Sequence, residues 1–201
     1  MQYSKTTQSD PQETARVFFD PAIGMHLFVD SPVKQRVKMD AERFLYYYPD
    51  KNIALAMDNR DATLASASMQ LFLYTDSEDL GLSNIGFKLI NYSVKNDTLI
   101  KKWEIKGKKK RESIQIEVYI HHERVQKTRS YDGFGKQIKE VVFSHWYELN
   151  NYFYPMHLSI KENDRISEYD YKQLKLLESI PDSILAMFIL PEDCEIHEYQ
   201  F

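Results

Sequence analysis

Short segments in which apolar and polar residues alternate follow one another along most of the chain. Between Ile114 and Ile120 every second residue is Ile or Val, and Met156, Leu158 and Ile160 repeat the pattern. A period of two places alternate side chains on opposite faces of a strand, so one face is apolar and the other polar. Antiparallel sheets tolerate this asymmetry, whereas parallel sheets need both faces covered. The pattern therefore predicts a one-sided antiparallel sheet.

One segment departs from the alternation. Residues 62–74 are rich in Ala and Leu without Gly or Pro, and Asp61 or Thr63 can cap them, so a helix is predicted there. Pro181 begins a short helical turn over 181–187, and an extended piece follows. Asn, Asp, Gly and Pro at the segment ends predict turns. The predicted strands cover about 14–20, 23–30, 33–40, 43–48, 52–58, 87–94, 98–106, 113–121, 124–131, 138–148, 153–162 and 165–175.

These elements predict a mainly β fold, an unclosed antiparallel half-barrel of about ten or eleven strands with a short helical lid. Residues 1–13 are expected to form a flexible lead-in, and residues 14–201 a single domain. A hydrophobic fraction of 43% is ample for a core. The net charge of -4 gives no reason to expect nucleic acid as a partner.

The sequence contains no recognisable catalytic or metal-binding motif. It has no Gly-rich phosphate loop, no nucleophile elbow and no His-Glu-x-x-His pattern. His121 and His122 are adjacent, so on a strand their rings would point to opposite faces and could not chelate one metal ion. Cys194 lies between acidic residues, which disfavour a reactive thiolate. We therefore expect a protein without enzymatic activity, cofactor or metal site.

The densest charge in the chain is the basic run from Lys106 to Arg111. It could contact anionic head groups or an acidic partner protein. We favour a second interpretation, a charged and solvated hairpin tip that discourages edge-to-edge association, because a turn between two strands needs no other explanation.

Aromatic and aliphatic residues are abundant in the predicted strands, and a single substantial helix is too little to cover so long a sheet. Sheet packing is the ordinary role of any one of these side chains. Together they predict an apolar cavity on the concave side. The expected lining is Leu27, Val37, Met39, Phe44, Tyr46, Leu64, Met69, Phe72, Leu99, Trp103, Ile116, Val118, Met156 and Leu158.

Five short motifs in the chain form a further pattern. An early strand ends in Pro32, and an aromatic hairpin over 43–52 contains Pro49. The others are Trp146-Tyr147, residues 154–160 and residues 188–193. In this order they resemble the LolA/LolB-type periplasmic carriers of outer-membrane lipoproteins, whose hairpin tryptophan is replaced here by Tyr46 to Tyr48. The resemblance implies an unclosed half-barrel with a helical lid over a cavity for acyl chains.

The leading hypothesis is therefore a non-enzymatic periplasmic carrier or chaperone that binds lipoprotein acyl chains or another lipid-like ligand. Envelope membrane proteins are possible partners, and we expect a monomer that is at most peripheral to a membrane. The periplasmic location is implied by the resemblance alone. The first residues of this chain show no apolar leader segment, which fits a cytoplasmic protein and a mature exported protein equally well. The alternative is a protein-interaction module of the cell envelope whose cavity is filled by its own side chains.

Overall fold

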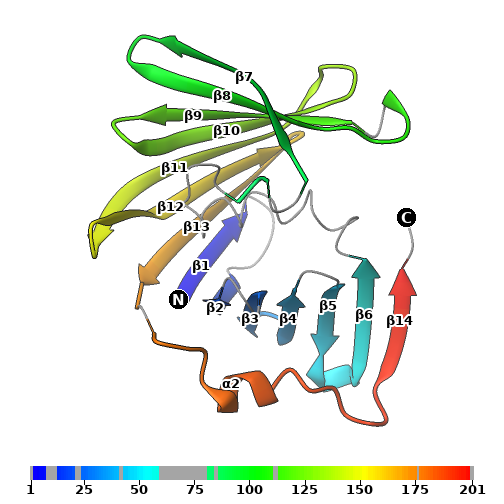
Figure 1. Ribbon diagram of the computed structural model, residues 1–201. Coiled ribbons are helices and arrows are strands. Elements are labelled where there is room, and N and C mark those ends of the chain that lie inside the picture. Colours follow the sequence, from blue (N-terminus) through cyan, green and yellow to red (C-terminus); the bar gives the residue numbers. More distant parts are fainter. Residues whose placement is uncertain are drawn as a thin grey trace. The chain divides into compact units, whose positions relative to one another are not determined.

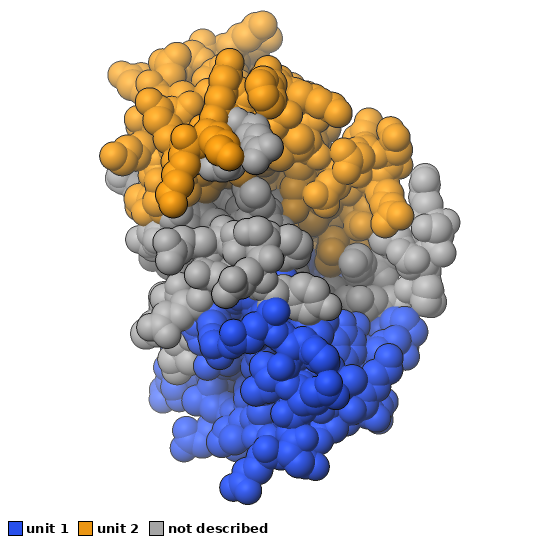
Figure 2. All heavy atoms as spheres, turned by 90° about the vertical axis from the view of Figure 1, so that its right-hand side faces the viewer, with its two compact units in different colours: residues 1–65, 170–201 blue, residues 66–169 orange. Residues whose placement is uncertain are grey.

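A computed structural model describes residues 2–7, 13–20, 24–40, 43–58, 81–83, 86–110, 113–175 and 177–199. The fold is mainly β, and its sheets are not closed into a barrel (Figure 1). The chain forms two compact units, residues 1–65 with 170–201 and residues 66–169, which Figure 2 colours separately. The expectation of a single domain stays a prediction.

The first unit contains a seven-stranded sheet in the order β14-β6-β5-β4-β3-β2-β1. Its strands pair antiparallel except at one edge, where β14 runs parallel to β6. A 3-10 turn, η1 (Pro49–Lys51), precedes β6, and α2 (Asp182–Ala186) precedes β14. The strands are β1 (Gln2–Thr7), β2 (Glu13–Asp20), β3 (Gly24–Ser31), β4 (Gln35–Met39), β5 (Arg43–Tyr48), β6 (Ile53–Asp58) and β14 (Glu195–Tyr199).

The second unit contains antiparallel strands in the order β13-β12-β11-β10-β9-β8-β7. The last of these in sequence, β13, runs across the boundary between the two units at Asp170. The strands are β7 (Lys88–Lys95), β8 (Thr98–Ile105), β9 (Ile114–His121), β10 (Arg124–Asp132), β11 (Gln137–Leu149), β12 (Tyr152–Glu162) and β13 (Arg165–Gln173).

Turn chemistry explains how the strands are connected. Asn96 with Asp97 and Asn150 with Asn151 have positive φ angles, the backbone conformation that two-residue hairpin turns require and that Asn and Asp tolerate. Gly24 has φ 106, and a Cβ there would lie 2.1 Å from the carbonyl oxygen of Met39. Only glycine therefore allows β3 to begin so close to β4.

The mainly β, antiparallel and unclosed fold predicted from the alternation is confirmed, and the described residues form fourteen strands in place of about ten or eleven. Every predicted strand segment contains a strand. The two others are β1, within the segment predicted as a lead-in, and β14, within the extended C-terminal piece. The helical lid predicted over 62–74 lies outside the described residues.

A row of apolar residues crosses one face of strands β2 to β6 in the first unit. The register aligns Val17, Leu27, Val37, Tyr46 and Leu55 across β2, β3, β4, β5 and β6. Directly opposed residues in an antiparallel pair point to the same face, so this row is continuous. The opposite face of β3 is buried as well, because the ring of Phe188 contacts His26 and Phe28, with centroids 4.6 and 4.7 Å away.

Candidate functional site

The apolar face of the first unit contains five of the residues predicted to line a cavity. Leu27, Val37, Met39 and Phe44 are buried, and Tyr46 is half-buried beside Phe44, with ring centroids 4.8 Å apart. Leu27, Val37 and Tyr46 lie in one cross-strand row, and Met39 pairs with Phe44 in the next. The structure thus brings these five together on a single face.

The second unit contains six more of the predicted residues. Trp103, Ile116, Val118 and Leu158 are buried, and Leu99 and Met156 are half-buried. Trp103 is aligned with Ile116, and Leu158 with the buried Phe143. The remaining three, Leu64, Met69 and Phe72, lie outside the described residues. A ligand cavity lined by all of these residues therefore stays a prediction.

The apolar face of the second unit also contains polar side chains that the sequence analysis did not single out. Across β8 to β11 the register aligns Trp103 with Ile116, Ile116 with Ser130, and Ser130 with Lys139. Lys139 is 9% exposed and Trp103 6%. In the neighbouring row Thr128, also buried, lies opposite Val118 and Val141. A lysine inside an apolar face is uncommon, since burial disfavours its charged form.

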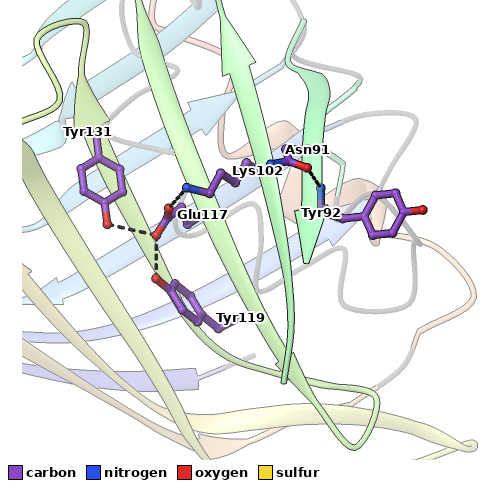
Figure 3. A network of polar contacts seen from close by, with 6 residues as sticks. All are labelled: Asn91, Tyr92, Lys102, Glu117, Tyr119 and Tyr131. Carbon is purple, nitrogen blue, oxygen red and sulfur yellow. Dashed lines mark hydrogen bonds and ion pairs between the residues drawn. The ribbon is translucent and has the colours of Figure 1, made fainter. Parts of the chain in front are cut away.

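The other face of this sheet carries a network of charged and phenolic groups (Figure 3). The carboxylate of Glu117 accepts hydrogen bonds from the hydroxyls of Tyr119 and Tyr131 at 2.6 and 3.0 Å, and pairs with Lys102 at 2.7 Å. Arg129, aligned with Glu117 on the next strand, pairs with Glu140 at 2.6 Å. Charges of opposite sign therefore alternate from strand to strand across β8 to β11.

These contacts shift the acid–base properties of the network. Burial and the hydrogen bond to Glu117 raise the pKa of Tyr119 to about 12. Burial by itself would raise the pKa of Glu117, but the hydrogen bonds from Lys102, Tyr119 and Tyr131 lower it overall. Near neutral pH Tyr119 therefore stays neutral and Glu117 stays ionised. The network stabilises the sheet and holds no group poised for proton transfer.

Strand β7 is exposed along its whole length, on both faces. Leu89, Tyr92 and Val94 lie opposite Trp103, Lys101 and Leu99, so they belong to the apolar face. They are 46%, 69% and 71% exposed. In Figure 3 the ring of Tyr92 points away from the Glu117 network. The apolar face thus continues to the edge of the sheet, where it reaches solvent.

The histidines and the cysteine do not gather into a catalytic or metal-binding group among the described residues. His122 lies in the turn after β9 with φ 47, and its ring centroid is 4.0 Å from that of His121. The prediction that the two rings point to opposite faces was therefore wrong, because His122 leaves the strand. Within the described ranges no group of three or more His, Cys, Asp or Glu residues could hold a metal ion. Burial and its acidic neighbours raise the pKa of Cys194, as predicted.

The basic run lies at the turn between β8 and β9, and its residues 106 and 108–110 are exposed. Lys106 pairs with Glu104 at 3.8 Å, and the ammonium of Lys110 lies 5.7 Å from the ring centroid of Phe134. The first contact lies at the end of β8, and the second joins this turn to the turn between β10 and β11. The charged hairpin tip stays a prediction. In the part of the chain that the structure describes, no helix has the length and apolar character needed to cross a membrane.

Comparison with known proteins identifies the fold. The chain resembles a LolA superfamily protein from Nitrosomonas europaea, with a TM-score of 0.58 at 12% identity over 91% of this chain and 86% of the other. An outer membrane lipoprotein-sorting protein domain from Vibrio parahaemolyticus aligns with a TM-score of 0.63 at 11% identity, over 94% and 89% of the two chains. A DUF1329 family protein from Desulfovibrio piger gives 0.56 at 11%, over 94% and 89%.

No protein-family model and no curated protein matches the sequence. The LolA-like resemblance inferred from the five short motifs is confirmed at the level of the fold. At 11–12% identity the likeness does not extend to cargo or partners.

Proposed function

We propose that the protein is a non-enzymatic carrier of the bacterial cell envelope that binds an acyl chain or similar apolar ligand against its apolar sheet faces. The fold supports the proposal, since a neighbour of the same fold is described as a lipoprotein-sorting domain. The observation that carries it is the grouping of the predicted lining residues on one face within each unit. The periplasm is the compartment that this function implies.

The free energy available on such a face is sufficient for binding. Each buried methylene contributes about 0.8 kcal/mol, so a chain of about ten carbons contributes about 8 kcal/mol before the cost of association is subtracted. Polar groups beside the chain would orient a head group and would perform no chemistry on it.

The two tryptophans provide a direct test of this proposal. Trp103 is buried on the apolar face of the second unit, whereas Trp146 is half-buried on β11. A Trp146→Phe variant leaves Trp103 as the reporter, and Trp103→Phe leaves Trp146 as the matched control. Fatty acids that carry a bromine or nitroxide quencher at successive carbons should quench Trp103 at micromolar concentration, and Trp146 much less.

The same samples serve for displacement of a fluorescent fatty acid and for native mass spectrometry. Co-purified lipid, or displacement by chains of about eight to eighteen carbons, is the expected result. A folded protein that binds none of these chains, with neither tryptophan quenched, would overturn the carrier and favour the interaction module.

The exposed edge strand favours that second function, the recognition of a partner protein. The segment between Lys88 and Lys95 contains no charge, no Pro and no Gly, which is the composition of strands that readily pair with another chain. Both lysines lie on the polar face, opposite Glu104 and Thr98. Self-pairing in antiparallel register would bring Lys88 against Lys95 of a second copy, so the strand that fits has an acidic residue at each end.

A pair of designed peptides tests this second function. One alternates Val and Thr between terminal glutamates, and its counterpart ends in lysines. The glutamate peptide should bind more tightly and protect the amides of β7 from exchange. The double variant Lys88→Glu/Lys95→Glu should reverse the preference. Equal binding of both peptides, or protection elsewhere in the chain, would exclude β7 as the interaction surface.

A further inference from the structure

Three side chains with hydrogen-bond donors form a row across the largely apolar face of the second unit, whose neighbouring row contains Lys101 and Thr128. Trp103, Ser130 and Lys139 occupy aligned positions on β8, β10 and β11, and the buried Ile116 completes the row on β9. We call these three residues the donor row. Because opposed residues in an antiparallel sheet point to the same face, the three side chains share the face that holds Val118 and Val141.

One member of the donor row has a buried donor without a partner, and a second is largely covered. The indole Nε1 of Trp103 is inaccessible to solvent and makes no hydrogen bond with any described residue. Lys139 is 9% exposed and makes no ion pair or hydrogen bond in the described part of the chain, but its Nζ is not among the buried atoms without a partner, so its stem is covered while its ammonium keeps access to solvent. A buried donor without an acceptor, such as the Trp103 indole, carries a desolvation cost.

No described carboxylate forms an ion pair with the Lys139 ammonium. Burial lowers the pKa of its ammonium, and Glu162, which faces it from β12, acts only through its field. Glu162 is itself exposed, and no contact within ion-pair distance joins the two residues. A natural sequence could fill this position with an aliphatic residue, as it does at Val141 and Phe143 of the same strand. The stem of Lys139 thus packs on this face while its ammonium stays at the boundary with solvent, from where it can meet the charge of a ligand that lies on the face.

The chemistry of the row selects the ligand. Lysine and the indole N–H donate and cannot accept, and the Ser130 hydroxyl can also donate. A ligand that satisfies all of them presents acceptors only and carries negative charge. Carboxylates and phosphates meet both conditions, and a charge-assisted hydrogen bond to Lys139 in an apolar setting is strong.

We propose that the donor row binds the anionic head group, a carboxylate or a phosphate ester, of an amphiphile whose apolar chain lies along Val118, Val141, Phe143 and Leu158. This inference rests on the proposed carrier function and narrows its cargo to anionic amphiphiles. Lys139 supplies the charge, and Ser130 and Trp103 orient the head group. The Thr128 hydroxyl lies in the next cross-strand row, beside the proposed path of the ligand's apolar chain.

Ligands with the same chain and different heads separate the head-group site from the apolar site. Dodecanoate, dodecyl phosphate and dodecanol share twelve carbons, and their affinities are measured by displacement of a fluorescent probe. Wild-type protein should bind one of the two anions at least about tenfold more tightly than dodecanol. The preferred anion identifies the source of the head group, a fatty acid or a phospholipid-like molecule.

Variants of Lys139 assign the effect to this residue. Lys139→Met keeps the length of the side chain and removes its charge, so anion affinity should fall about tenfold or more, while dodecanol binds as before or more tightly. Lys139→Arg should retain the preference for anions. Lys161→Met is the matched control, because Lys161 is exposed and lies opposite Glu140 on the other face. It should change neither affinity.

A spectroscopic readout does not depend on affinity. The indole N–H resonance of Trp103 should shift downfield with the preferred anion and not with dodecanol, since only the anion supplies the missing acceptor. Equal affinity for all three ligands, or equal losses for anion and alcohol in Lys139→Met, would overturn the donor row as a head-group site. Failure of every ligand to bind would instead overturn the proposed carrier function.

Discussion

The two units carry apolar sheet faces of different character. In the first unit the rows through Val37 and Met39 are apolar from strand to strand. In the second unit the corresponding surface includes Thr128, Ser130 and Lys139 among its aliphatic residues. A uniformly apolar face favours any hydrocarbon equally, whereas isolated donors on such a face discriminate between ligands by their head groups. The comparison locates selectivity in the second unit.

The opposite faces differ as well. On the first unit Phe188, from the segment after α2, covers the outward face of β3, and the side chain of Arg36 donates a 2.6 Å hydrogen bond to the carbonyl of Met187. On the second unit the outward face is left to the Glu117 network. The first unit thus buries side chains on both faces of β3, whereas the second buries one face of its sheet and carries paired charges on the other.

The largest expected effect comes from placing a charge on the apolar face of the second unit. Val118→Asp puts a carboxylate at a position that is 0% exposed, and should lower the free energy of unfolding by about 4 kcal/mol or more. Val142→Asp is the matched control, because Val142 is 39% exposed on the other face, and should change it by less than about 0.5 kcal/mol. Urea denaturation measures both. Equal losses would show that the two faces are not distinguished by burial.

Removal of the aromatic cover on the first unit should be the next largest effect. Phe188→Ala deletes the ring that contacts His26 and Phe28, and we expect a loss of about 3 kcal/mol in unfolding free energy. Ile189→Ala, at a position 74% exposed, should cost less than about 0.5 kcal/mol. A loss at Ile189 as large as that at Phe188 would contradict this packing.

His26 should make the stability of the first unit depend on pH. Burial, followed by the field of Lys38, lowers the pKa of His26 from 6.5. Above pH 6.5 the residue is neutral in both states, whereas below it the unfolded state binds the proton first, so stability falls until the pH reaches the folded pKa. The loss is at most about 1.4 kcal/mol per pH unit.

The variant His26→Phe should remove this contribution, so its urea midpoint between pH 7.5 and 5.5 should fall less than that of the wild type. His197→Phe, on the exposed strand β14, should retain the wild-type slope. An unchanged slope in His26→Phe would show that His26 accepts its proton as readily in the folded protein as in the unfolded chain.

The smallest effect is expected in the outward network of the second unit. Glu117→Gln removes the charge that Lys102 pairs with, and because Lys102 is 42% exposed the cost should be only about 1 kcal/mol. The pKa of Tyr119 should fall from about 12, since the carboxylate no longer opposes ionisation of the phenol. Phenolate absorbance at high pH measures the change, and Glu148→Gln is the exposed control. A Tyr119 titration that does not move would remove Glu117 as its cause.

Much of the fold follows from local pattern. Alternation from Ile114 to Ile120 is confirmed as β9, whose residues alternate between buried and half-buried up to Tyr119. The turns at Asn96 and Asn150 depend on residue types that tolerate a positive φ, so they too are visible in the sequence. The hairpins therefore need no information from distant parts of the chain.

Other features arise from contacts between residues far apart in sequence. The pairing of β14 with β6 is parallel, and no local pattern shows which edge a terminal strand will join. His26 is buried because Phe188 lies against it. In the sequence a histidine is expected to be a polar, outward residue, whereas β3 is buried without interruption from Met25 to Val29.

What the sequence by itself determined is the β class of the protein, its one-sided strands and the turns between them, because these depend on side-chain period and on backbone conformation within a few residues. Only the tertiary structure decided that Trp103, Ser130 and Lys139 would form the donor row. Near Lys139 the apolar residues Val141 and Val142 are adjacent, so alternation does not show which of them faces inward. Cross-strand register resolves this, because it aligns Lys139 with Ser130 and Ser130 with a buried isoleucine.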